Sequence, residues 1–243
     1  MGMNMENYAG FMVPRADFKV ESFDTLIKQK GYRVVWEQAM FCSCYNLETG
    51  QPRDVCPTCK GKGYIYFDPV ETRSLVTSIS GRKEQEHIGL NEMGTAYLTP
   101  LSTDNVGFRD RFRFMDFTMK HSQLMRRSEL SYDTPTYDIR NVISVRKLDR
   151  ILHQGIHFEL SKNGKEIQWK PGVLEVGDMY SILYDTIAVY ICMGPIHELR
   201  GTYTMHKTTV EKFVQLPKQF QIKREDFVDA DTPEPGYRPP FMG

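Results

Sequence analysis

Short apolar runs that alternate with polar residues recur along most of the chain, and this pattern predicts strands. One helix is expected at 23–30, where Ser22 could cap the start and Gly31 could close the end, with Phe23, Leu26 and Ile27 on one face. Long amphipathic helical patterns are missing from the sequence. The expected strands occupy residues 32–39, 64–67, 73–80, 95–98, 111–117, 139–147, 157–160, 166–169 and 178–193.

For one hairpin the sequence predicts which residues of the two strands pair. Asn163-Gly164 is a typical pair for a two-residue type I′ turn, which needs a positive φ at both positions. That turn places Leu160 opposite Ile167 and Phe158 opposite Trp169, with all four side chains on one face of the ribbon. The turn chemistry and the alternation therefore agree on the same structure.

The predicted fold is mainly β, with an antiparallel β-barrel or sandwich body, a small inserted zinc-ribbon-like lobe and extended terminal arms. The two ends are rich in Met, Gly or Pro and lack strand periodicity, so they could lie along neighbouring subunits or fold back on their own body. Their candidate subunit-contact residues are Phe11, Met12, Tyr237 and Phe241. The expected organisation is an N-terminal arm (1–18), a short helix and first strand (19–40), the four-cysteine lobe (41–67), the antiparallel β body (68–228) and a Pro-rich C-terminal arm (229–243).

Composition narrows the class of protein. The chain has 243 residues, enough for a core of its own, and 40% of them are hydrophobic. Lys plus Arg equal Asp plus Glu at 31 each, so nucleic-acid binding would need a local patch. No apolar run is long enough to span a bilayer and the first residues do not resemble a signal peptide, so we expect no membrane partner and a reducing cytoplasmic compartment.

Four of the five cysteines fall in one short polar stretch. Cys42-x-Cys44 and Cys56-x-x-Cys59 are separated by eleven residues, a spacing at which two pairs of thiolates can converge on one tetrahedral ion. We predict one structural zinc ion; two disulfides, which a reducing compartment disfavours, and an iron–sulfur cluster are the alternatives. Because four thiolates leave zinc no open coordination position, such a site would fold the loop and would not catalyse a reaction.

The segment after Cys59 has two interpretations. Glycines at 61 and 63 could adopt positive φ and let backbone amides approach the sulfurs. Lys60 and Lys62 interleave with aromatic residues, as in some nucleic-acid-binding surfaces. Tyr64 to Phe67 also reads as a strand that packs on the body, which we favour.

A row of arginines is the other candidate contact surface. Arg109, Arg111 and Arg113 alternate with Phe112 and Phe114, so a strand there would carry arginines on one face and rings on the other. The row is either an ordinary solvated face or a surface that meets an acidic patch on a neighbouring subunit.

Catalytic motifs are not apparent. The six histidines are scattered, no Gly-x-Ser-x-Gly elbow or phosphate-binding loop occurs, and Cys192 lies in an apolar run typical of a buried core thiol. We therefore do not expect an enzyme, with a hydrolase the weakest of the functional alternatives.

The motifs together resemble virion proteins of tailed bacteriophages. The residues that carry the likeness are the Cys-x-Cys loop with "ETGQP", then "CPTCKGKGYIY", "GDMYSILY" and "QLPKQFQIKREDF". The resemblance is to neck proteins of the head–tail connector or head-closure type, with Cys42, Cys44, Cys56 and Cys59 matching the metal ligands and no catalytic residues carried over.

The resemblance implies a β-barrel or sandwich that assembles as a ring on the portal. Its partners would be copies of itself, the portal or adaptor and tail proteins, with packaged DNA touched only in passage. The protein would be located in the virion after assembly in the host cytoplasm. The alternatives are a tail-completion or baseplate adaptor protein, which needs the same architecture, and a zinc-ribbon nucleic-acid-binding regulator.

Overall fold

The computed structural model describes residues 20–46, 48–49, 51–53, 56–59, 61–78, 94–196, 201–206 and 209–228. The predicted arms, with Phe11, Met12, Tyr237 and Phe241, lie outside these residues. The fold is mainly β with antiparallel sheets, as predicted. Its elements are α1 (Val20–Lys30), β1 (Tyr32–Phe41), β2 (Tyr64–Ser78), β3 (Thr95–Thr99), β4 (Arg111–Arg126), β5 (Tyr132–Asp133), β6 (Asn141–Lys147), β7 (Arg150–Leu152), β8 (Phe158–Leu160), β9 (Ile167–Trp169), β10 (Met179–Pro195), β11 (Gly201–His206), β12 (Thr209–Gln215), β13 (Phe220–Arg224) and α2 (Glu225–Val228).

Six strands build the first half of the molecule. They pair in the order β13, β3, β2, β1, β4 and β10, and β10 pairs again with β13, so the antiparallel pairings follow a closed cycle. Alternate residues of these strands point to one apolar core, as period-two alternation requires. Its buried members include Val34, Trp36, Leu98, Phe112, Phe114, Cys192, Phe220 and Ile222.

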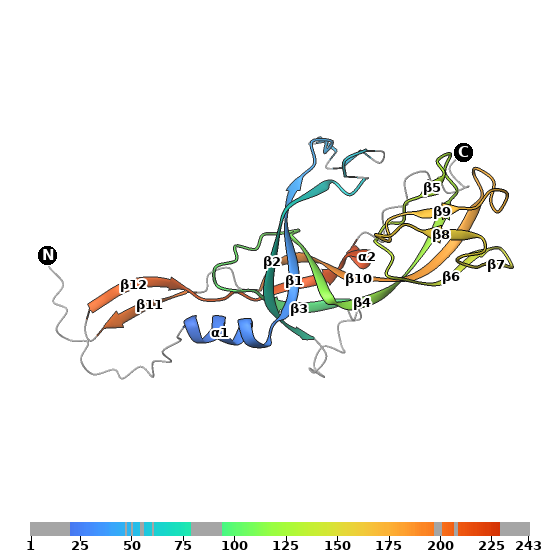
Figure 1. The fold of residues 1–243 in the computed structure, drawn as a ribbon. Coiled ribbons are helices and arrows are strands. Elements are labelled where there is room, and N and C mark those ends of the chain that lie inside the picture. The colour runs from blue at the N-terminus through green and yellow to red at the C-terminus, as the bar shows by residue number, and fades with distance from the viewer. Residues whose placement is uncertain are drawn as a thin grey trace, which may run out of the picture.

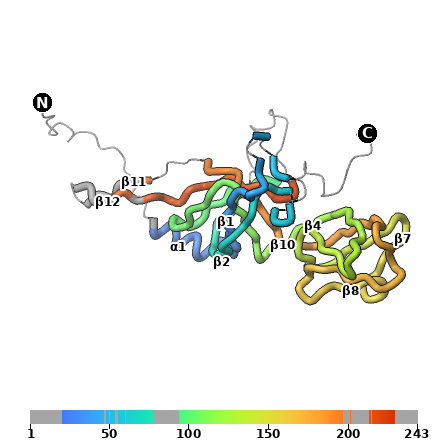
Figure 2. Tube along the Cα trace, turned by 90° about the horizontal axis from the view of Figure 1, so that it is seen from above, coloured from blue at the N-terminus to red at the C-terminus, as the bar shows by residue number. Residues whose placement is uncertain are grey.

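The long strands β4 and β10 continue beyond this cycle into the second half (Figure 2). The register between them shifts because Ile187 pairs with Thr118 while Ala188 pairs with Phe114, which leaves residues 115–117 of β4 as a bulge. Beyond the bulge, β6 and β7 extend the sheet and a small sheet of β5, β9 and β8 completes the half. A second core there includes Val145, Leu152, Phe158, Ile167, Tyr180, Ile182 and Tyr184.

Each half contains one tryptophan that donates to a buried aspartate. Trp36 Nε1 donates to Asp110 at 2.8 Å in the first half. Trp169 Nε1 donates to Asp133 at 2.7 Å in the second, where the Tyr180 hydroxyl also donates to Asp133 at 2.9 Å. Burying a carboxylate costs free energy unless it accepts several hydrogen bonds. The bonds to Asp110 and Asp133 therefore hold each tryptophan in a defined position in its core.

The predicted hairpin is confirmed in register and wrong in turn type. Phe158 pairs with Trp169 and Leu160 pairs with Ile167, as expected. Only Gly164 has a positive φ, of 70°, and its amide donates to the Ser161 carbonyl at 2.9 Å. The loop is therefore a turn over 161–164 that ends in a left-handed glycine.

Several element boundaries differ from the prediction. The helix begins at Val20, so Ser22 lies in its first turn and is not the cap, whereas Gly31 does close it through a 2.7 Å bond to the Ile27 carbonyl. The hairpin of β11 and β12, which extends away from the first half in Figure 1, was not predicted. The body predicted for 68–228 contains two cores joined by β4 and β10.

Candidate metal centre

The four clustered cysteines lie in the loop at the far end of the β1–β2 hairpin. Cys42 and Cys44 follow the last residue of β1, and Cys56 and Cys59 belong to the turn that leads into β2. The Cys42 amide donates to the Gly63 carbonyl at 2.8 Å, which closes the base of the loop. Because β1 and β2 pair directly, the hairpin brings the two halves of the motif together.

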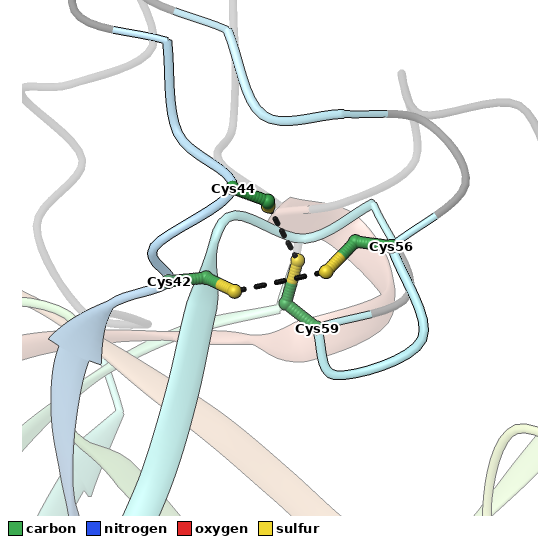
Figure 3. A group of neighbouring side chains, drawn as sticks. All are labelled: Cys42, Cys44, Cys56 and Cys59. Carbon is green, nitrogen blue, oxygen red and sulfur yellow. Dashed lines mark hydrogen bonds between the residues drawn. The ribbon is translucent and has the colours of Figure 1, made fainter.

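The sulfurs point toward one another (Figure 3). Sγ of Cys42 lies 3.7 Å from Sγ of Cys56, and Sγ of Cys44 lies 3.4 Å from Sγ of Cys59. All four ligand atoms lie within 4.8 Å of one another. A tetrahedral ion with bonds of ~2.3 Å to sulfur requires sulfur–sulfur separations of about 3.8 Å. The four cysteines could therefore hold a metal ion with little rearrangement, and as free thiols they do not form the two disulfides considered above.

The surroundings of the thiols shift the pKa values of Cys56 and Cys44 in opposite directions. Hydrogen bonds from the amides of Cys59 and Thr58 lower the pKa of Cys56 to about 6, because they favour its thiolate. Burial raises the pKa of Cys44 to about 12. The Cys56 thiolate is thus favoured, and a bound cation would displace the proton from Cys44.

Turn chemistry holds the loop around the sulfurs. Gly61 and Gly63 have φ of 83° and 77°, which confirms the predicted positive values. On the opposite side, the Asn46 side chain accepts from the Glu48 amide at 2.8 Å, and the Asn46 amide donates to the Gln51 carbonyl at 2.9 Å. Within the two cysteine turns, the Tyr45 amide donates to the Cys42 carbonyl at 3.0 Å and the Lys62 amide donates to the Cys59 carbonyl at 3.0 Å, so local hydrogen bonds fix both pairs.

The lobe is fastened to the body through an ion pair. Lys62 Nζ lies 2.8 Å from Glu225 Oε1, whose residue is 1% exposed at the start of α2. Sequence reasoning considered Lys62 for a nucleic-acid patch and missed Glu225, which lies 163 residues away. Lys60 lies outside the described residues. Tyr64, in β2 as predicted, packs its ring 4.9 Å from that of Phe41, so this aromatic residue contributes to the lobe's own packing.

The arginine row is partly engaged within the chain. Glu37 accepts from Arg111 Nε at 2.6 Å and lies 3.2 Å from Arg113, while the Arg111 guanidinium lies 4.0 Å from the Tyr66 ring centre. Arg109 precedes β4 and lies 5.2 Å from the Tyr64 ring centre. Phe112 and Phe114 are buried, as the alternation predicted. Contact of this row with another subunit stays a prediction.

Other titratable groups lie apart from the cysteines. His121 Nδ1 is 4.0 Å from Asp226, and its ring packs edge-on against Tyr137 at 4.8 Å. Burial lowers the pKa of His121, so the neutral ring is favoured. Cys192 is fully buried, as predicted, and burial raises its pKa to about 12.

Comparison with known proteins adds no assignment. No protein-family model matches the chain, and a search of curated proteins finds no significant relative. Within the described residues, neither helix is long and apolar enough to cross a membrane.

Proposed function

We propose that this chain is a structural protein of a tailed-phage virion that forms a ring in the neck, connects the portal to the tail and helps to close the genome exit channel. The observation that carries the proposal is the four-cysteine lobe. It lies at the tip of the β1–β2 hairpin, its four sulfurs lie within 4.8 Å of one another, and beside them the ring of Phe41 packs against those of Tyr45 and Tyr64. Such a lobe is suited to contacts between proteins.

The ion in the lobe is one structural zinc. Four thiolates in a tetrahedral arrangement are a donor set that zinc takes readily, and they leave no place for water or substrate. The role of the ion is then to fold the loop between β1 and β2. An iron–sulfur cluster is the alternative that the same ligands allow.

Exposed aromatic residues near the lobe support an assembling role. Phe41 at the end of β1 is 58% exposed and Phe108 before β4 is 57% exposed. Rings of this size on a surface are favourable anchors for a protein interface. The partners are copies of this chain, the portal or adaptor and tail proteins, with DNA contacted only in passage.

The nucleic-acid-binding alternative is less well supported. Its patch relied on Lys60 and Lys62, and Lys62 is paired with the buried Glu225. A tail-completion or baseplate adaptor role stays a genuine alternative, because it requires the same architecture.

Position in the particle tests the proposal. A tagged copy of the chain would be incorporated into particles of the source virus and located by antibody labelling in electron micrographs. Label at the head–tail junction supports the neck, whereas label at the baseplate favours the adaptor role. A Cys56→Ser copy serves as the matched control, which we expect to be left out of particles. Equal incorporation of that copy would contradict the role given to the lobe.

A further inference from the structure

Beside the lobe, next to the exposed Phe41 and Phe108, lies a second surface. It consists of Arg109, Arg111 and Arg113 with the rings of Tyr64 and Tyr66, and we call it the arginine–tyrosine surface. The guanidinium groups of Arg109 and Arg111 lie 5.2 and 4.0 Å from the ring centres of Tyr64 and Tyr66. Stacked guanidinium groups keep outward N–H groups that can bind carboxylates.

The surface retains a positive charge. The three arginines and Lys62 provide four cationic groups, against the three carboxylates of Glu37, Asp110 and Glu225. Arg109 has no carboxylate partner in the part of the chain that the structure describes. An acidic ligand would complete this set of charges.

Arg109 is also held in place by its backbone. Its φ is 70°, an uncommon value for a residue with a side chain, and its amide donates to the Cys192 carbonyl at 2.8 Å. The turn is fixed by Asp110, which accepts from the Gly107 amide at 2.8 Å and from the Ala39 amide at 2.9 Å. A left-handed arginine that its surroundings hold so firmly is typical of a functional position.

We infer that the arginine–tyrosine surface binds the acidic segment 229–243 of its own chain. That segment begins "DADTPEPGY", with carboxylates at 229, 231 and 234, and it contains prolines at 233, 235, 239 and 240. The carboxylates match the arginines in charge. The prolines favour an extended conformation that packs well on aromatic rings such as those of Tyr64 and Tyr66.

The connection makes this contact reachable. The segment follows α2 directly, and α2 begins with Glu225, which is paired with Lys62. Lys62 is two residues before Tyr64, over which Arg109 lies. Six extended residues span roughly 20 Å, enough to carry the carboxylates from α2 along this part of β2. The inference does not depend on the proposed virion role, and it assigns the C-terminal arm to its own body and not to a neighbour.

Peptide binding to the full-length chain tests the inference. The probe is a fluorescent peptide of residues 229–243, and the receptor is a chain whose own segment is neutralised by Asp229→Asn, Asp231→Asn and Glu234→Gln. We expect saturable anisotropy binding that weakens as salt rises. Wild-type chain should bind at least about tenfold more weakly, because its own segment occupies the surface at high effective concentration.

Matched variants locate the binding. In the neutralised chain, Arg109→Ala should weaken peptide binding about fivefold, the worth of one good ion pair. Arg150→Ala in β7, on the other half of the molecule, should leave it unchanged. A probe peptide carrying the same three neutral substitutions should not bind.

Four outcomes would overturn the inference. They are no saturable binding at low salt, equal binding by wild-type and neutralised chains, equal binding by the Arg109→Ala chain, and displacement of the peptide by an equimolar oligonucleotide. The second outcome would indicate that the segment binds a neighbouring subunit, and the last would indicate that the surface binds nucleic acid. None of them bears on particle labelling, so failure here and failure of the proposed function are distinguishable.

Discussion

Replacing Lys62 with methionine should loosen the attachment of the lobe to the body. Methionine keeps most of the apolar stem of lysine but removes the ammonium that lies 2.8 Å from Glu225. The carboxylate of Glu225, 1% exposed, would then lose the ion-pair partner that the lobe supplies. Glu225→Gln differs from Lys62→Met because it removes the buried charge instead of its partner. The charge that remains is on Lys62, whose side chain is 28% exposed and can be solvated by water.

The structure sets the size of the effect. Leaving a buried charge unpaired typically costs 3–5 kcal/mol. Two features reduce this cost here: Arg111 also interacts electrostatically with Glu225, and the Lys62–Glu225 pair is partly open to solvent on the lysine side. We therefore expect Lys62→Met to lower the free energy of unfolding by about 2–3 kcal/mol. Glu225→Gln should cost about 1 kcal/mol, and the double variant should be more stable than Lys62→Met alone.

The two tryptophans make a selective assay possible. Trp36 belongs to the first core and Trp169 packs against the second. In a Trp169→Phe background, urea unfolding followed by fluorescence reports the half to which Lys62 is attached. A Lys62→Met change below about 0.5 kcal/mol, or a double variant less stable than both single variants, would refute the reasoning, because a solvated pair contributes little.

Three further predictions follow from individual groups. The purified chain should contain about one zinc ion, with the absorption of a tetrathiolate site after cobalt substitution, and Cys56→Ser should lose both; undiminished metal would contradict a four-cysteine site. Burial lowers the pKa of His121 below its unfolded value of 6.5, so on acidification the unfolded chain binds this proton before the folded chain does. The free energy of unfolding should therefore fall as the pH drops below 6.5 towards the folded pKa. His121→Gln should flatten that pH dependence of the free energy of unfolding, and an unchanged slope would assign it to other groups. Gly164→Ala should lower the free energy of unfolding by at least about 2 kcal/mol, because φ at this position is 70° and an added Cβ would meet the Ile139 carbonyl. The measurement is urea unfolding followed by Trp169 fluorescence, and a midpoint equal to that of the wild type would contradict the turn.

The sequence predicted those features that depend on neighbouring residues. The register of the β8–β9 hairpin and the convergence of the four cysteines were both expected, since each follows from short spacing and turn chemistry. The turn type was wrong because Gly164 alone supplies the positive φ that the six-residue connection needs.

Features that depend on distant residues could not be predicted. The Lys62–Glu225 pair joins positions 163 residues apart, and no local pattern marks either of them as a partner. Likewise, the strand expected at 111–117 is longer in the structure. A bulge at 115–117 interrupts its pairing with β10, after which β4 continues to Arg126 by pairing with β10 again.

The copy number of this chain in purified particles tests the central claim most directly. Quantitative peptide mass spectrometry would compare it with the major capsid protein of the same particles. The virion role predicts a small, ring-sized number of copies in every particle. Absence of the chain from particles would contradict that role and would leave a zinc-ribbon regulator as the stronger explanation of the lobe.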